Sequence, residues 1–117
     1  MNPTIYHNPR CSKSCATLEL LRQRGLEPVV IEYLTTPPTA EELKNILGML
    51  GIGPRELLRR TEARQAGLED PALSDDALIA VMIANPAVIE RPIVIADGKA
   101  AIGRPPERVL TILPGAV

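Results

Sequence analysis

Aromatic residues are nearly missing from this chain, which has no tryptophan, no phenylalanine and two tyrosines, Tyr6 and Tyr33. Its core must therefore consist of aliphatic side chains, and 117 residues are enough for one domain with a single modest core. No apolar run approaches the roughly 20 residues that span a membrane, and the first residues do not resemble a signal peptide. We therefore expect a cytoplasmic protein with no membrane association.

An excess of charge of either sign is also lacking, because the formal net charge is −1. The chain therefore has no electrostatic footprint for nucleic acid. Cysteine is scarce, and two thiols without an export signal indicate a reducing compartment, in which cysteines are more often catalytic than structural. Arginine, by contrast, supplies ten of the 13 basic residues. This bias reflects either codon composition or oxyanion binding, for which the planar guanidinium is better suited than lysine.

The first 34 residues predict a strand, a helix and a second strand. Residues 4–7 are β-prone, residues 12–24 carry leucines among polar neighbours, and Gly25 is a typical helix terminator. Residues 29–34 predict a strand that is buried on at least one face. A strand, helix and strand in this order predict parallel pairing of the two strands.

Residues 37–86 predict helices and no strand. Three helices are expected there, one opened by a capping box of Thr39 and Glu42, one over residues 55–64, and one capped by Ser74. This segment is therefore interpreted as a helical insert within a single domain that spans the whole chain.

Sheet character returns at residues 93–96, and Asp97-Gly98 is the strongest hairpin signal in the chain. Residues 99–103 form the expected return strand, and residues 107–113 form the last expected helix. The order βαβ, helical insert, ββα predicts an α/β fold with a mixed four-stranded sheet.

Cys11 lies between the first predicted strand and the first predicted helix. The unpaired N–H groups at a helix start favour a thiolate over a thiol, and they also bind anions. The flanking segments, Asn8-Pro9-Arg10 and Ser12-Lys13-Ser14, are too polar for a core position. Cys11 is therefore interpreted as a reactive nucleophile, with a buried and inert cysteine as the alternative.

Three nearby residues are candidates for assisting Cys11. His7 either lowers the pKa of the thiol or orients a water, or it is an ordinary strand-end residue. Ser14 either hydrogen-bonds the thiolate or caps the helix locally. Cys15 is either a resolving thiol or a bystander, because a spacing of four residues on a helix separates the Cα atoms by about 6 Å, near the outer limit for a disulfide.

An oxyanion site would need positive charge from distant arginines. A phosphatase-type Cys-x5-Arg loop is excluded, because position 17 is threonine. Arg91 precedes Pro92 at the start of a predicted strand, and we expect the bond between them to be cis, as is typical of a proline packed against an active-site loop. Arg59 and Arg104 are further candidates, although a single arginine is more often a solvated surface residue.

Five motifs occur in order along nearly the whole chain: Tyr6-His7-Asn8-Pro9-Arg10-Cys11-Ser12-Lys13-Ser14, Tyr33-Leu34-Thr35-Thr36-Pro37-Pro38-Thr39, Glu56-Leu57-Leu58-Arg59, Arg91-Pro92-Ile93-Val94 and Gly103-Arg104-Pro105. Together they resemble the glutaredoxin-dependent arsenate reductases of the ArsC type. This resemblance implies a thioredoxin-like fold with a helical insertion and makes Cys11 the nucleophile with His7 and Ser14 as its neighbours. It assigns the oxyanion to three arginines, Arg59, Arg91 and Arg104.

The resemblance also implies a reaction, in which arsenate is reduced to arsenite through a covalent adduct on Cys11. Glutathione would be the co-substrate and a glutaredoxin the partner, with no bound cofactor and no metal, and we expect a monomer. Two alternatives are a redox-sensing regulator of the Spx type, which binds RNA polymerase, and a glutathione-dependent thiol–disulfide reductase. The Spx switch uses Cys-x-x-Cys, and its second cysteine position is Ser14 here.

Overall fold

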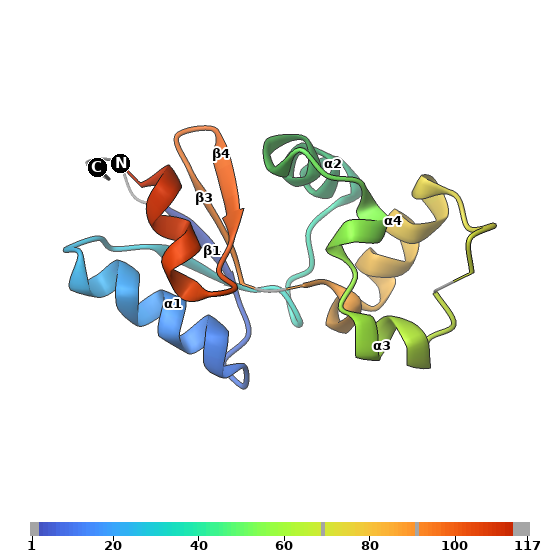
Figure 1. Cartoon of the computed structure of the whole chain (residues 1–117), viewed down its shortest axis with the longest axis horizontal. Coiled ribbons are helices and arrows are strands. Elements are labelled where there is room, and N and C mark those ends of the chain that lie inside the picture. The colour runs from blue at the N-terminus through green and yellow to red at the C-terminus, as the bar shows by residue number, and fades with distance from the viewer. Residues whose placement is uncertain (1–2, 69, 91, 114–117) are drawn as a thin grey trace. The chain divides into compact units, whose positions relative to one another are not determined.

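The computed structural model describes residues 3–68, 70–90 and 92–113. Its backbone contacts divide the chain into two units, one formed by residues 1–36 with 91–117 and one formed by residues 37–90 (Figure 1). The sheet belongs to the first unit and the predicted helical insert to the second. That the two units make up one domain stays a prediction.

The first unit contains a mixed four-stranded sheet. Its strands are β1 (Thr4–His7), β2 (Val29–Glu32), β3 (Ile93–Ala96) and β4 (Lys99–Ile102), in the order β2-β1-β3-β4. β1 pairs in parallel with β2 and antiparallel with β3, and β3 pairs antiparallel with β4. A parallel pair needs a crossover, which is provided by helix α1 (Ser12–Gln23). The predicted βαβ and ββ parts of the sheet are therefore confirmed.

The prediction that residues 29–34 form a strand buried on one face is wrong. β2 ends at Glu32, and three of its four residues are exposed, with Val29 at 54%. The reason is the strand order, because β2 lies at an edge of the sheet and has only β1 as a neighbour. Tyr33, directly after the strand, is buried.

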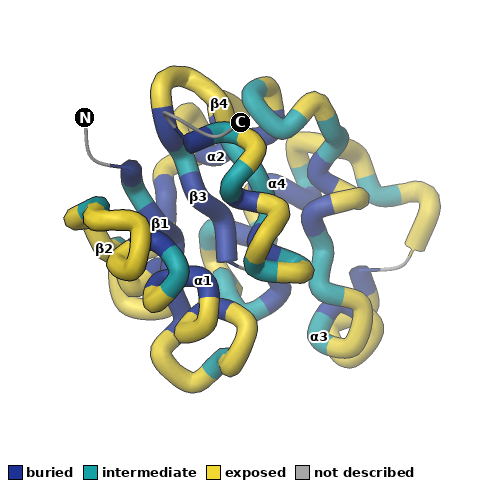
Figure 2. Tube along the Cα trace, turned by 60° about the vertical axis from the view of Figure 1, so that its left-hand side comes forward, coloured by how far each residue is buried: buried dark blue, intermediate teal, exposed yellow. Residues whose placement is uncertain are grey.

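An aliphatic cluster holds the sheet to its helices, as the composition predicted. Ile5 of β1 lies opposite Val94 of β3, so both side chains point to the same face of the sheet. They pack with Leu21 of α1 and with Val109 of η3 (Pro106–Ile112), and all four residues are fully buried. The two central strands are accordingly dark blue over most of their length in Figure 2.

The hairpin between β3 and β4 forms as the sequence predicted. Asp97 and Gly98 have φ angles of 51° and 74°, and two successive positive φ angles are the signature of the tight turn that suits the twist of a hairpin. The return strand is one residue shorter than expected, since it ends at Ile102.

The second unit is helical. Its helices are α2 (Ala40–Leu50), α3 (Arg60–Gln65) and α4 (Asp75–Ala84), with 3₁₀ turns η1 (Pro54–Leu57) and η2 (Pro86–Val88). The predicted capping box is present at the start of α2, where the Glu42 N–H donates to the Thr39 hydroxyl at 3.1 Å and Glu42 Oε1 accepts from the Thr39 N–H at 2.9 Å. None of the helices in the described residues is both long and apolar enough to cross a membrane.

The predicted helix over residues 55–64 is wrong, because the chain leaves helical geometry at Leu58. Leu58 instead forms an antiparallel bridge with Ile89, flanked by hydrogen bonds from Arg59 N to Val88 O and from Glu90 N to Leu57 O, both 2.7 Å long. The long-range pairing satisfies backbone groups that a continuous helix would have paired locally. The last predicted helix, over residues 107–113, is likewise corrected to the 3₁₀ helix η3.

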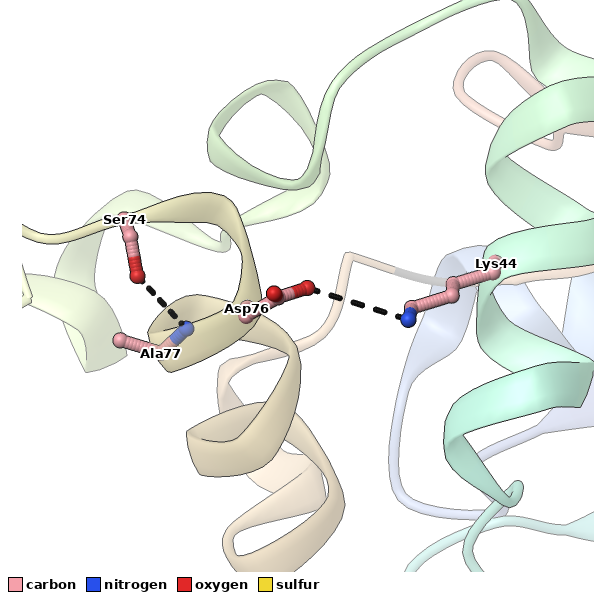
Figure 3. A network of polar contacts seen from close by, with 4 residues as sticks. All are labelled: Lys44, Ser74, Asp76 and Ala77. Atoms are coloured by element: carbon pink, nitrogen blue, oxygen red, sulfur yellow. Dashed lines mark hydrogen bonds and ion pairs between the residues drawn. The ribbon is translucent and has the colours of Figure 1, made fainter.

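Ser74 and Lys44 offer a test of what stabilises the helical unit (Figure 3). The Ser74 hydroxyl caps α4 by accepting from the Ala77 N–H at 3.1 Å, whereas Lys44 meets Asp76 at 3.8 Å with side chains 57% and 88% exposed. We expect Ser74→Ala to lower the free energy of unfolding by about 1 kcal/mol, and Lys44→Gln to lower it by less than about 0.5 kcal/mol. Denaturant titration measures the free energy of unfolding of both variants. Equal losses would contradict the view that the Ser74 cap stabilises the helical unit more than the Lys44–Asp76 ion pair does.

Candidate active site

Cys11 is the residue that begins α1. It occupies the N-cap position with extended backbone angles (φ −100°, ψ 120°), and its side chain makes no capping hydrogen bond. The Cys11 N–H donates to Asn8 O at 3.0 Å, and the Cys15 N–H donates to Cys11 O at 3.0 Å, so the loop and the first helical turn both fix this residue. The thiol is partly exposed. It therefore lies beside the positive end of α1, where a thiolate is favoured, and not in the core as the inert alternative required.

Arg104 brings a guanidinium to this sulfur from 93 residues away. Its Nη2 lies 3.5 Å from Cys11 Sγ and donates a hydrogen bond to it. The topology explains the contact, because Arg104 follows β4 closely, β4 pairs with β3, and β3 pairs with β1, which leads into Cys11. A fixed positive charge at this distance favours the ionised thiol.

His7 and Ser14 form a buried hydrogen bond behind the loop. Ser14 has no exposed surface, and its Oγ lies 2.6 Å from His7 Nδ1 and accepts from the Asn8 N–H at 3.0 Å. These two bonds tie α1 to the end of β1 and to the residue that follows it. A direct hydrogen bond from Ser14 to the Cys11 sulfur stays a prediction.

The pKa of His7 is lowered from its ordinary value. Burial of the imidazole is the largest cause, and Arg22 lowers the pKa further, while the carboxylate of Glu32 opposes both. His7 is therefore neutral at pH 7. With Nε2 protonated, its Nδ1 accepts a hydrogen bond from the Ser14 hydroxyl, so His7 acts on the loop through a hydrogen bond and not through positive charge.

Cys15 lies one turn after Cys11 and is exposed. Its thiol donates to the carbonyl of Pro9 at 3.3 Å. The side chain therefore turns toward the loop that precedes Cys11, and both cysteines are free thiols. The sequence left two roles open for Cys15, and neither is decided by this contact.

Arg59 belongs to the helical unit, where it begins α3. Its Nε lies 3.0 Å from Glu62 Oε2, and its side chain is 30% exposed. Its Nη1 is buried and has no hydrogen-bond partner among the described residues. A buried donor without a partner costs free energy unless something binds it, which is consistent with an anion ligand. That Arg59 lies near Cys11 stays a prediction.

Arg91, the third predicted oxyanion ligand, lies outside the described residues, and so does the predicted cis bond between Arg91 and Pro92. Pro92 itself is buried, and its carbonyl accepts from the Gly103 N–H at 2.9 Å. In the described part of the chain the Arg104–Pro105 bond is cis, which the sequence analysis did not anticipate.

Asn8 is a loop residue with a structural role that was not predicted from the sequence. It is buried, and its Oδ1 accepts from the Arg10 N–H at 3.0 Å while its own N–H binds Ser14. An asparagine that bonds the backbone two residues later is a common turn former, so the Asn8-Pro9 pair carried a signal for it. Within the ranges that the structure covers, no three His, Cys, Asp or Glu side chains gather into a possible metal site.

The sheet order and the cysteine at the start of the first helix define a thioredoxin-like protein with a thiol site. A structure described as arsenate reductase from Vibrio cholerae superposes with a TM-score of 0.92 at 50% identity, covering 97% of this chain and 98% of that one. The sequence model of the ArsC family matches residues 6–112. The chain belongs to the ArsC family.

Two relatives are similar over nearly their whole length. The uncharacterized protein YfgD of Escherichia coli (strain K12) is 54% identical over 112 residues, covering 93% of this chain and 94% of that protein. The arsenate reductase of Neisseria meningitidis (serogroup A, strain Z2491) is 46% identical over 112 residues, covering 93% and 96%. The predicted family and the predicted thioredoxin-like fold are therefore confirmed.

His7 is the single histidine of the chain, so its titration can be followed by NMR without ambiguity. We expect the imidazole to titrate below its ordinary pKa of about 6.5. At a pH between the pKa of His7 in the folded state and its ordinary pKa, the unfolded state binds more protons than the folded state. The free energy of unfolding therefore falls as the pH is lowered through this range. His7→Gln should remove this dependence. An imidazole that titrates at or above the ordinary value would contradict the burial argument.

Proposed function

We propose that this protein reduces arsenate to arsenite, with Cys11 as the nucleophile. The observation that carries the proposal is the hydrogen bond from Arg104 Nη2 to Cys11 Sγ, 3.5 Å long, at the N-terminus of α1. Membership of the ArsC family and the arsenate reductases among the relatives support the same substrate.

Charge explains why this chemistry needs arginine. Arsenate is an anion at neutral pH, and the thiolate that attacks it is an anion as well, so their approach is unfavourable without fixed positive charge. The start of α1 supplies only about half a unit charge. Arg104, together with Arg59 and Arg91, supplies the rest and offers planar donor pairs that match a tetrahedral oxyanion. The Nη1 of Arg59, which is buried and has no hydrogen-bond partner in the part of the chain that the structure describes, supports the place of Arg59 in this set.

The reaction proceeds in balanced thiol steps. The Cys11 thiolate attacks arsenic and forms an S–As bond, while one arsenate hydroxyl takes up a proton from the solvent and leaves as water. A glutathione thiolate then attacks the Cys11 sulfur, the S–As bond breaks, and its electron pair stays on arsenic, which becomes As(III) and leaves as arsenite. The two thiols have supplied the two electrons and form a mixed disulfide. A glutaredoxin thiolate then attacks the glutathione sulfur of this mixed disulfide. The S–S bond to Cys11 breaks, Cys11 is restored as a thiolate, and glutathione stays on glutaredoxin as a new mixed disulfide.

His7 and Ser14 hold the loop that presents Cys11 through the hydrogen bonds that Ser14 makes with His7 and Asn8. Cys15 is a bystander in this scheme, because glutathione and glutaredoxin resolve the oxidised Cys11 without it. The protein works as a cytoplasmic monomer with no bound cofactor, no metal, and no nucleic-acid or membrane partner.

Arsenate turnover in the presence of glutathione and glutaredoxin tests the proposal directly. We expect Cys11→Ser to abolish turnover with the fold retained, because Cys11 is a partly exposed loop residue. Cys15→Ser is the matched control and should retain most of the activity. If Cys11→Ser keeps more than about a tenth of the wild-type rate, the nucleophile is assigned wrongly. A Cys15→Ser protein as inactive as Cys11→Ser would make Cys15 an obligatory resolving thiol.

Arginine substitutions test the oxyanion site. Arg104→Lys keeps the charge but removes the planar fork, so we expect kcat/KM for arsenate to fall by at least about tenfold. Arg108→Lys, an exposed change four residues later, should alter kcat/KM by less than about twofold. Similar small effects of both substitutions on kcat/KM would argue against Arg104 as an oxyanion ligand.

A further inference from the structure

Gly103 differs from every other glycine that the structure describes. A Cβ atom built on Gly103 would lie 2.5 Å from Thr17 Oγ1, 2.8 Å from Pro92 Cγ and 3.1 Å from Thr17 Cγ2. At the six other described glycines the same atom would meet nothing within 4 Å. The φ angle of Gly103 is not in the left-handed region, so the position needs glycine for space and not for backbone torsion.

The partners of Gly103 are held firmly. Thr17 is fully buried on α1, and its hydroxyl donates to Lys13 O at 2.8 Å, so the side chain cannot turn away without breaking this bond. Pro92 has a closed ring, and its carbonyl is bonded to the Gly103 N–H. Glycine, which has no Cβ, is the residue that allows such a close approach of another segment to the backbone.

Gly103 also links the two elements that carry the Cys11–Arg104 contact. Arg104 is its neighbour in the chain, and Thr17 lies on the same helix that Cys11 begins. The separation between Gly103 and Thr17 therefore sets how far the Arg104 backbone stands from α1. We propose that Gly103, packed against Thr17, is a positioning residue that fixes the Arg104 guanidinium against the Cys11 sulfur.

The size of the effect follows from the overlap. A Cβ that would lie 2.5 Å from Thr17 Oγ1 must move by about 1 Å to reach ordinary contact, and displacements of this size in a reacting site lower rates strongly. The Arg104 guanidinium would then lie beyond hydrogen-bond distance of the Cys11 sulfur, so the thiolate would be less favoured relative to the thiol. The consequence for arsenate rests on the proposed function, whereas the consequence for the thiol does not.

The experiment measures the rate of Cys11 alkylation by iodoacetamide against pH, in a Cys15→Ser background so that one thiol reacts. We expect Gly103→Ala to move the midpoint of this profile to higher pH and to lower kcat/KM for arsenate by about tenfold. Gly48→Ala, at a glycine with open space in the last turn of α2, is the control and should change neither quantity.

Two further variants separate positioning from general destabilisation. Thr17→Ala/Gly103→Ala should bring the midpoint only part of the way back to that of the Cys15→Ser parent. It removes both Thr17 atoms that the new Cβ meets, but the overlap with Pro92 Cγ at 2.8 Å remains and leaves a smaller shift to higher pH. In an Arg104→Gln background, Gly103→Ala should cause no additional shift, because its effect passes through Arg104.

An unchanged midpoint in Gly103→Ala, or an equal shift in the Arg104→Gln background, would overturn the proposal. If Gly103→Ala does not fold, Thr17→Ala/Gly103→Ala is compared with Thr17→Ala, and identical midpoints overturn it. If the Cys15→Ser parent does not turn over arsenate while the midpoints of the alkylation profiles shift as expected, the proposed function is wrong and the positioning role of Gly103 stands.

Discussion

The interaction on which the site depends is the contact between the Cys11 sulfur and the Arg104 guanidinium at the start of α1. A cysteine in a loop is a weak nucleophile unless its thiolate is favoured, and here two sources of positive charge converge on one atom. The helix supplies a partial charge through its unpaired N–H groups, and Arg104 supplies a full charge with directional donors. Each source alone leaves the thiolate less favoured, so both the helix start and the last strand must be in place.

The order of the strands is what makes this convergence possible. β1 carries the chain into Cys11, and β3 lies between β1 and β4, so the end of the hairpin comes close to the N-terminus of α1. The aliphatic cluster around Ile5 and Val94 fixes α1 and η3 to the sheet. On the helix side, the bonds among His7, Asn8 and Ser14 prevent the loop from shifting away from the sheet. Packing and hydrogen bonding thus hold two charged groups in one place.

Local signals in the sequence predicted the elements that local interactions determine. The capping box of Thr39 and Glu42 and the Asp97-Gly98 turn formed as expected, because their hydrogen bonds and torsions involve neighbouring residues. The break at Leu58 was missed, because its partner Ile89 lies 31 residues later and only the folded chain brings them together. The exposure of β2 depends on strand order, which hydrophobic patterning does not encode. Likewise, Cys11 was predicted as the nucleophile from its place between a strand and a helix. Its pairing with Arg104 was expected from the family resemblance, and the close approach of Gly103 to Thr17 is seen only in the folded chain.

The exposed edge strand β2 has a consequence for aggregation. Val29, Val30 and Ile31 are β-branched residues on an edge with unpaired backbone groups, which is the usual template for adding a strand from another molecule. The run is bounded by Glu27 and Pro28 on one side and by Glu32 on the other. Two carboxylates and a proline therefore cut the apolar window to three residues, shorter than the about five to seven that amyloid-like stacking requires. The residues that flank this strand act as gatekeepers, which lower the tendency of the open edge to pair with a strand of another copy of the chain.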